Sequence, residues 1–149
     1  MRAADELPLR FGGVSPYLYY EDAAEAVAWL TEVFGFTEAV RYVDPDGGVF
    51  EARVAAGDAK IMLAGVGPGY WRAKGTHGPV GQLVVVYVND VRAHHARVRA
   101  AGVDAPAPVD QPYGARVYTV SDPGGNSWCF WQRLRDEVEL PPGWREVRP

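Results

Sequence analysis

The feature that most constrains the fold of this 149-residue chain is a pattern of segments that occurs twice. In the first half, an apolar run over 16–20 leads to Asp22, and in the second half a run over 83–88 leads to Asp90. In both halves a segment of helical length follows, and a glycine separates it from further apolar stretches. Repetition of this kind indicates that one supersecondary unit is used twice.

Each unit is predicted to contain one helix, over 23–34 in the first half and over 91–101 in the second. Asp22 and Asp90 can accept hydrogen bonds from the free N–H groups of the first helical turn. The glycine that follows each helix can take the left-handed conformation that commonly ends one. Apolar side chains recur at helical spacing in the first helix, at Ala23, Val27, Leu30 and Phe34.

Three strands are expected after each helix, because apolar stretches alternate there with turn-forming residues such as those of 44–48 and 122–125. The expected strands cover 37–43, 49–56 and 59–64 in the first unit, and 104–109, 115–121 and 127–132 in the second. The order is therefore βαβββ, twice. The expected divisions are an N-terminal extension (1–13), a first module (14–65), a joining loop (66–80), a second module (81–133) and a C-terminal tail (134–149).

Composition narrows the class of protein. Apolar residues make up 48% and aromatic residues 12%, which is enough to bury a core without a structural metal. The net charge of -4 and the lack of a Lys/Arg run argue against nucleic acid or an anionic membrane as partner. Cys129 is the single cysteine, so no internal disulfide is expected. No segment has the pattern of a signal peptide or a membrane span, and a cytoplasmic location is expected.

The repeated units also resemble a known family. The Asp-capped helix ending in Phe34-Gly35-Phe36 and the turn Asp122-Pro123-Gly124-Gly125-Asn126 look like those of the vicinal oxygen chelate superfamily, over about Val14–Gln132. That superfamily includes glyoxalase I, extradiol dioxygenases, fosfomycin-resistance enzymes and bleomycin-binding proteins. The resemblance implies an α+β fold in which two βαβββ modules form a curved mixed sheet around a central cavity. It also implies a homodimer.

Enzymes of the superfamily usually bind a divalent metal through His or Glu on the first and last strands of the modules. The matching positions in this chain are Ser15, Met62, Leu83 and Cys129. These side chains lack the converging carboxylate oxygens and imidazole nitrogens that divalent ions require. A register shift of one residue adds only Gln82, and the three histidines lie in a loop and on a helix. We therefore expect no metal, no other cofactor and no catalytic residue.

Side chains alternate along a strand, so the neighbours of these positions two residues away should also face the cavity. A stretch at 111–116 resembles the pocket mouth of the metal-free relatives. The expected ligand-binding residues are Tyr17, Tyr19, Leu83, Val85, Tyr87, Tyr113, Arg116, Cys129 and Trp131. The side chains expected beneath the helices are Leu18, Tyr20, Val84, Val86, Trp128 and Phe130. Two alternatives stay open: the aromatic residues are core filler, and Arg116 is a surface residue of a hairpin.

Other residues have alternative interpretations. Tyr70 and Trp71 either close over the pocket as a lid or anchor a packed loop. Cys129 is either a nucleophile or, in the favoured interpretation, a buried structural thiol, because no base for it is evident. His77 is a general base only if its loop folds over the cavity.

An aromatic, metal-free cavity favours a small-molecule binding protein like the bleomycin-resistance proteins, which holds an aromatic or cationic compound such as an antibiotic. The alternative is a metal-dependent glyoxalase-like or dioxygenase-like lyase, isomerase or oxygenase. A third hypothesis is a dimerisation module without a ligand of its own.

Overall fold

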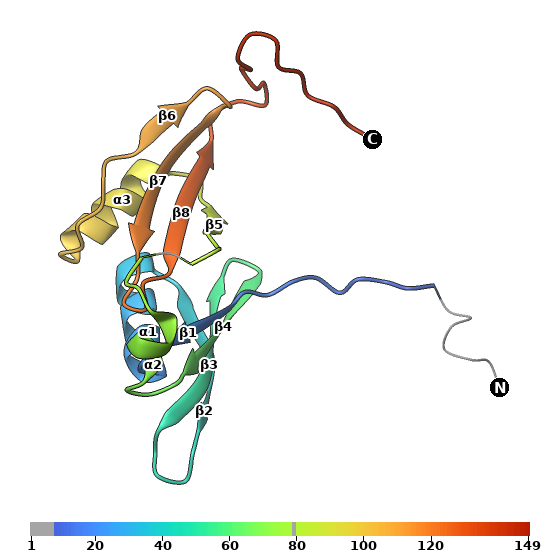
Figure 1. Cartoon of the computed structure of the whole chain (residues 1–149). Coiled ribbons are helices and arrows are strands. Elements are labelled where there is room, and N and C mark those ends of the chain that lie inside the picture. The colour runs from blue at the N-terminus through green and yellow to red at the C-terminus, as the bar shows by residue number, and fades with distance from the viewer. Residues whose placement is uncertain (1–7, 79) are drawn as a thin grey trace.

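The computed structural model describes residues 8–78 and 80–149 (Figure 1). Residues 1–7 of the expected N-terminal extension and Pro79 of the joining loop lie outside the described residues. The first module contains β1 (Tyr17–Tyr20), α1 (Ala23–Trp29), the π-helical turn η2 (Leu30–Phe34), β2 (Thr37–Val43), β3 (Val49–Ala56) and β4 (Ala59–Gly65). Its strands form a sheet in the order β1-β4-β3-β2, in which β1 runs parallel to β4.

The second module repeats this arrangement. It contains β5 (Val84–Tyr87), α3 (Val91–Ala100), β6 (Val109–Gln111), β7 (Ala115–Ser121) and β8 (Ser127–Arg133). Its sheet has the order β5-β8-β7-β6, with β5 parallel to β8. The predicted α+β fold of two βαβββ modules is confirmed. The two sheets remain separate, stacked end to end in Figure 1, and do not close into a barrel.

The helix boundaries follow the predicted signals. The Asp22 carboxylate accepts a hydrogen bond from Glu25 N at 3.1 Å, and Asp90 accepts one from Ala93 N at 3.0 Å. Gly35 ends the first helical segment with a φ of 81°. The last five residues of that segment form a π-helical turn rather than a continuation of α1. No helix in the described part of the chain is long and apolar enough to cross a membrane.

Two predictions of secondary structure were wrong. The strand expected over 104–109 begins only at Val109, the first residue of β6, because Pro106 and Pro108 have no N–H to donate to a neighbouring strand. The joining loop contains a short helix, α2 (Tyr70–Lys74), which the glycine-rich sequence around it did not indicate. Tertiary hydrogen bonds described below hold this helix, so local propensity does not predict it.

The core lies between the helices and one face of each sheet. All six side chains predicted to lie beneath the helices do so, and the most buried are Leu18, Tyr20, Trp128 and Phe130. At the junction of the modules, the ring of Phe34 contacts Trp29 and Phe130 at 4.8 Å, and Trp128 at 5.3 Å, between centroids. Because Trp128 and Phe130 belong to β8, the cores of the two modules are continuous.

A buried carboxylate joins the modules near the same place. Asp122, at the turn between β7 and β8, is 6% exposed. It accepts hydrogen bonds from the Tyr20 hydroxyl at 2.6 Å and from the Trp128 indole N–H at 2.9 Å. It also accepts the backbone N–H groups of Gly124 and Asn126, each at 2.9 Å. Burial and the adjacent Asp122 charge raise the pKa of Tyr20 well above its ordinary value. Tyr20 of β1 is thus fixed to the second module.

Candidate functional site

Each sheet has one face that no helix covers, and we call these the first and second open faces. The first open face contains Tyr17, Tyr19, Glu51, Arg53 and Met62, which follow from the register of β1, β4 and β3. The rings of Tyr17 and Tyr19 lie 5.4 Å apart, and Tyr19 is 52% exposed. Arg53 Nε is buried without a hydrogen-bond partner in the described part of the chain. The guanidinium of Arg53 also lies 3.6 Å from the Glu51 carboxylate, and the sequence did not single this ion pair out.

The second open face contains Val85, Tyr87, Val117, Cys129 and Trp131, which are neighbours in the register of β5, β8 and β7. The Trp131 ring lies 6.2 Å from that of Tyr87 and stacks on Tyr113 at 4.9 Å, with 26° between the planes. Tyr87 is 72% exposed. An accessible aromatic surface therefore lies across β5 and β8, in which Tyr113 and Trp131 are stacked and the Tyr87 ring is tilted by 67° to Trp131.

The predicted ligand-binding residues are distributed over both open faces. Tyr17 and Tyr19 lie on the first, whereas Val85, Tyr87, Cys129, Trp131 and the stacked Tyr113 lie on the second. Leu83 precedes β5 and is half-exposed, two residues from Val85.

Arg116 is not brought together with the other eight. It pairs in register with Gln132, on the side of β7 that faces α3. Its guanidinium donates two hydrogen bonds to Asp110, at 2.5 and 3.1 Å. The hydrogen bond from Arg116 lowers the pKa of the Asp110 carboxyl. The structure thus places Arg116 in an ion pair within the β6–β7 hairpin. This agrees with the interpretation of Arg116 as a hairpin residue rather than a ligand-binding one.

The C-terminal tail holds the turn that presents Tyr113. The backbone N–H groups of Leu134 and Arg135 donate to Gly114 O, at 2.8 and 3.3 Å. The Arg135 guanidinium donates to Pro112 O at 2.9 Å. Gly114 has a φ of 83°, and a Cβ there would lie 2.8 Å from Glu137 O. Glycine is therefore required for the tail to approach the turn, and this contact fixes Tyr113 against Trp131.

Cys129 has the environment of a structural thiol. It is 6% exposed and packs with Ala115, Val117 and Trp131. Burial raises the pKa of its thiol, and a hydrogen bond with Thr119 opposes that shift only in part. Because the thiolate is the reactive form, this environment does not support a nucleophile.

The donor set does not fit the divalent metal that the superfamily's enzymes bind. Met62 and Cys129 occupy equivalent positions on β4 and β8, beside Tyr17 and Val85 of the first strands. Among residues 8–78 and 80–149, no group of three or more His, Cys, Asp or Glu side chains could hold an ion. A thioether and a buried thiol do not replace carboxylate or imidazole ligands.

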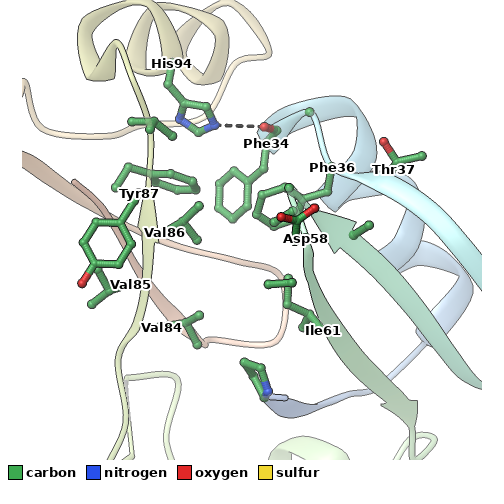
Figure 2. A pocket seen from close by; sticks show the side chains of 18 residues that line it. Phe34, Phe36, Thr37, Asp58, Ile61, Val84, Val85, Val86, Tyr87 and His94 are labelled. Atoms are coloured by element: carbon green, nitrogen blue, oxygen red, sulfur yellow. Dashed lines mark hydrogen bonds between the residues drawn. The ribbon is translucent and has the colours of Figure 1, made fainter. Parts of the chain in front are cut away.

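A cleft of about 530 Å³ lies between the modules, with β5 on one side and η2 and the β3–β4 turn on the other (Figure 2). Figure 2 shows Val86 on the side of β5 that faces Phe34, and Tyr87 on the other side. His94 of α3 lies at the edge of the cleft. Its Nε2–H donates to Phe34 O at 2.9 Å, so its Nδ1 accepts the Tyr118 hydroxyl at 2.5 Å. His94 therefore links α3 to η2, a role that its place on a predicted helix surface did not indicate.

This histidine predicts a pH dependence of stability. Burial lowers the pKa of His94 in the folded protein, and the Phe34 carbonyl only partly opposes it, while Arg97 and His95 lower it further. Below the unfolded-state pKa of about 6.5, the unfolded chain binds more protons, so stability is lost as the pH falls. We expect the free energy of unfolding in urea to fall less steeply in His94→Gln than in the unmodified protein, between about pH 8 and about pH 5.

His77→Gln is the matched control, because His77 is exposed in the joining loop and stacks only on Trp71. It should keep the pH dependence of the unmodified protein. An unchanged pH dependence in His94→Gln would show that this histidine does not control it.

Two separate βαβββ sheets, each with one face that no helix covers, define a protein of the vicinal oxygen chelate fold. The model of the glyoxalase/bleomycin resistance protein/dioxygenase superfamily matches residues 12–130, and the chain belongs to that superfamily.

Among solved structures, the chain is similar to TioX from Micromonospora sp. ML1, with 33% identity and a TM-score of 0.64, over 81% of this chain and 95% of TioX. It has the fold of the bleomycin resistance determinant encoded on transposon Tn5, at 15% identity and a TM-score of 0.61, over 83% of this chain and 98% of that one. An uncharacterised Mycobacterium tuberculosis protein is 29% identical over 128 residues, which are 83% of this chain and 75% of that protein.

Proposed function

We propose that the protein binds a small aromatic molecule, such as an antibiotic, on its open faces without a metal and without converting it. The observation on which this rests is the Tyr113–Trp131 stack beside the exposed ring of Tyr87. Aromatic side chains normally bury most of their surface, and an exposed group of them favours stacking with a planar or cationic ligand. The likeness to a bleomycin resistance determinant supports a sequestering role.

The two faces supply different chemistry to such a ligand. The second open face is apolar, with the buried thiol of Cys129 and the side chain of Val117 beside the aromatic rings. The first adds the tyrosine hydroxyls and the ion pair of Arg53 with Glu51, which are 3.6 Å apart. Neither face supplies carboxylate and imidazole groups in the number that a metal-dependent lyase or oxygenase needs. Binding without turnover is therefore the function that the chemistry supports best.

We further propose that the binding unit is a homodimer. Strands β1 and β5 are both edge strands, so each has one side without a partner strand in the described part of the chain. The open faces carry exposed apolar side chains beside those edges, among them Tyr19, Leu83 and Tyr87. A second copy would pair with the free edges of β1 and β5 and cover the open faces. Both the unpaired backbone groups and the exposed apolar side chains would then be buried.

Replacing Trp131 by alanine is expected to weaken ligand binding by up to roughly tenfold, because an aromatic stacking contact contributes about 0.5–1.5 kcal/mol. The measurement is calorimetric titration of the protein with bleomycin and with a panel of planar aromatic antibiotics. At least one of these compounds should bind the unmodified protein saturably.

Trp144→Ala is the matched control, since Trp144 lies in the tail and is 72% exposed. It should bind as the unmodified protein does. If Trp131→Ala binds every compound as tightly as the unmodified protein does, the ligand binds elsewhere. Stoichiometric zinc, nickel, iron or manganese in the purified protein, with no compound bound, would favour the metal-dependent enzyme instead.

A further inference from the structure

A second cavity, of about 450 Å³, lies beneath α2 and is formed within one chain. Its apolar walls are Tyr19 at the end of β1, Val66 after β4, Tyr70 and Ala73 of α2, and Val80 of the joining loop. Its polar groups are Lys74, Gln82, Asn126 and Ser127. A mostly apolar cavity with a few converging polar groups has the composition of a small-molecule site. We call it the α2 pocket.

The α2 helix is fixed over this pocket by long-range hydrogen bonds. The buried Tyr70 donates its hydroxyl to Gly124 O at 2.5 Å. The Lys74 ammonium donates to Gly78 O at 2.9 Å and to Gly125 O at 3.0 Å. A Cβ at Gly125 would collide with Lys74 Nζ, so glycine is needed there for the ammonium to approach. The pocket is therefore preformed, and its cation is held in one position.

Charge decides which ligand suits the pocket. Among the residues that the structure describes, Lys74 is the one charged residue that lines the pocket, and no carboxylate lines it. Lys74 forms no ion pair with any residue of 8–78 or 80–149. An ammonium has three N–H donors, and two of these donate to the carbonyls of Gly78 and Gly125. The ammonium also lies 5.4 Å from the centroid of the Trp71 ring, which compensates its charge only weakly. One N–H and most of the positive charge remain for a ligand.

We propose that the α2 pocket binds a compact aromatic anion, such as an aromatic carboxylate. The ring lies against Tyr19, Val66 and Val80, and the carboxylate accepts the remaining N–H of Lys74. The amide of Gln82 at the rim can donate to the second carboxylate oxygen. The site goes beyond the function proposed above, because it needs neither a second copy nor the aromatic rings of β5 and β8. Tyr19 is the residue that it shares with the first open face.

Calorimetric titration with naphthalene-2-carboxylate, and with the uncharged naphthalene-2-carboxamide of the same shape, tests this site. We expect the full-length protein to bind the carboxylate and to bind the amide at least about tenfold more weakly, since one such charge-assisted contact is worth about 1.4 kcal/mol or more. Lys74→Met should reduce affinity for the carboxylate to that for the amide. Lys60→Met replaces the other lysine of the chain, outside the pocket, and should change neither affinity.

Lys74→Met also removes two hydrogen bonds that anchor α2, so a second variant is needed. Ala73→Trp fills the pocket from an exposed position and leaves Lys74 in place, and it should abolish binding of both compounds. Equal affinity for carboxylate and amide, no binding of either, or unchanged binding in Ala73→Trp would overturn the proposal. Trp131→Ala should bind naphthalene-2-carboxylate normally, which separates this site from the one proposed on the second open face.

Discussion

Asp122→Ala is expected to lower the free energy of unfolding by about 3–5 kcal/mol, because it leaves several buried donors without an acceptor. The Tyr20 hydroxyl and the Trp128 indole N–H both point at this carboxylate, and both side chains are about 1% exposed or less. The backbone N–H groups of Gly124 and Asn126 lose the same acceptor. The measurement is urea unfolding at neutral pH, followed by tryptophan fluorescence and by circular dichroism.

The matched control is Asp110→Ala, which removes a carboxylate from an exposed ion pair with Arg116. Exposed ion pairs contribute little, so this variant should unfold close to the unmodified protein. Tyr20→Phe isolates one donor and should cost about 1–2 kcal/mol. If Asp122→Ala is no less stable than Asp110→Ala, the buried carboxylate does not hold the modules together.

The Asp122 network also positions the candidate sites. Asn126, whose backbone and side chain both donate to Asp122, donates a further hydrogen bond to Tyr19 O at 3.5 Å. Tyr19 lies at the edge of the first open face and in the wall of the α2 pocket. The turn that forms the junction between modules therefore also orients a residue of both proposed binding sites.

The fold could be predicted because its signals are local. A carboxylate two residues after an apolar strand caps each helix, and a glycine with positive φ follows each helix. Strand alternation separated Leu18 and Tyr20, which are buried, from Tyr17 and Tyr19, which are exposed. The π-helical turn was not predictable, because its start at Leu30 leaves the apolar spacing of the first helix unchanged.

The candidate sites could be predicted only where strand register decides them. The open-face residues follow from alternation along β1, β5 and β8, whereas Arg116 is one residue from Val117 on β7, so its side chain lies on the opposite face, toward α3. The α2 pocket escaped prediction because Tyr70 and Lys74 bind carbonyls more than 50 residues away in the sequence. His94 likewise gains its role from Phe34, 60 residues distant.

Shared fold does not decide function in this superfamily, and in this chain the side chains of the open faces distinguish the hypotheses. A metal-dependent enzyme needs side chains that hold the ion, whereas a sequestering site needs apolar area and ring contacts with the ligand. The positions equivalent to metal ligands hold Met62 and Cys129, beside Tyr17 and the Val85–Trp131 surface. The chemistry of the faces therefore favours binding by burial and stacking.

Phe34→Ala is expected to cost about 3–5 kcal/mol, as large-to-small changes of buried aromatic residues do. The Phe34 ring is 3% exposed and contacts rings of both modules, including Trp29 of α1 and Phe130 of β8. Its carbonyl also accepts the hydrogen bond from His94, but alanine retains that carbonyl. The decrease in the free energy of unfolding should therefore reflect the packing at the junction of the modules. Urea unfolding measures this decrease.

Phe50→Ala is the matched control, because the Phe50 ring is 53% exposed on β3 and should contribute little to stability. If the junction couples the modules, Phe34→Ala should still unfold in one transition, at a lower urea concentration, with the fluorescence of Trp29 and Trp128 changing together. Two separate transitions would mean that the modules unfold independently once the ring is removed. A stability equal to that of Phe50→Ala would contradict the aromatic junction, and the open faces would then lack the rigid support that stacking on them requires.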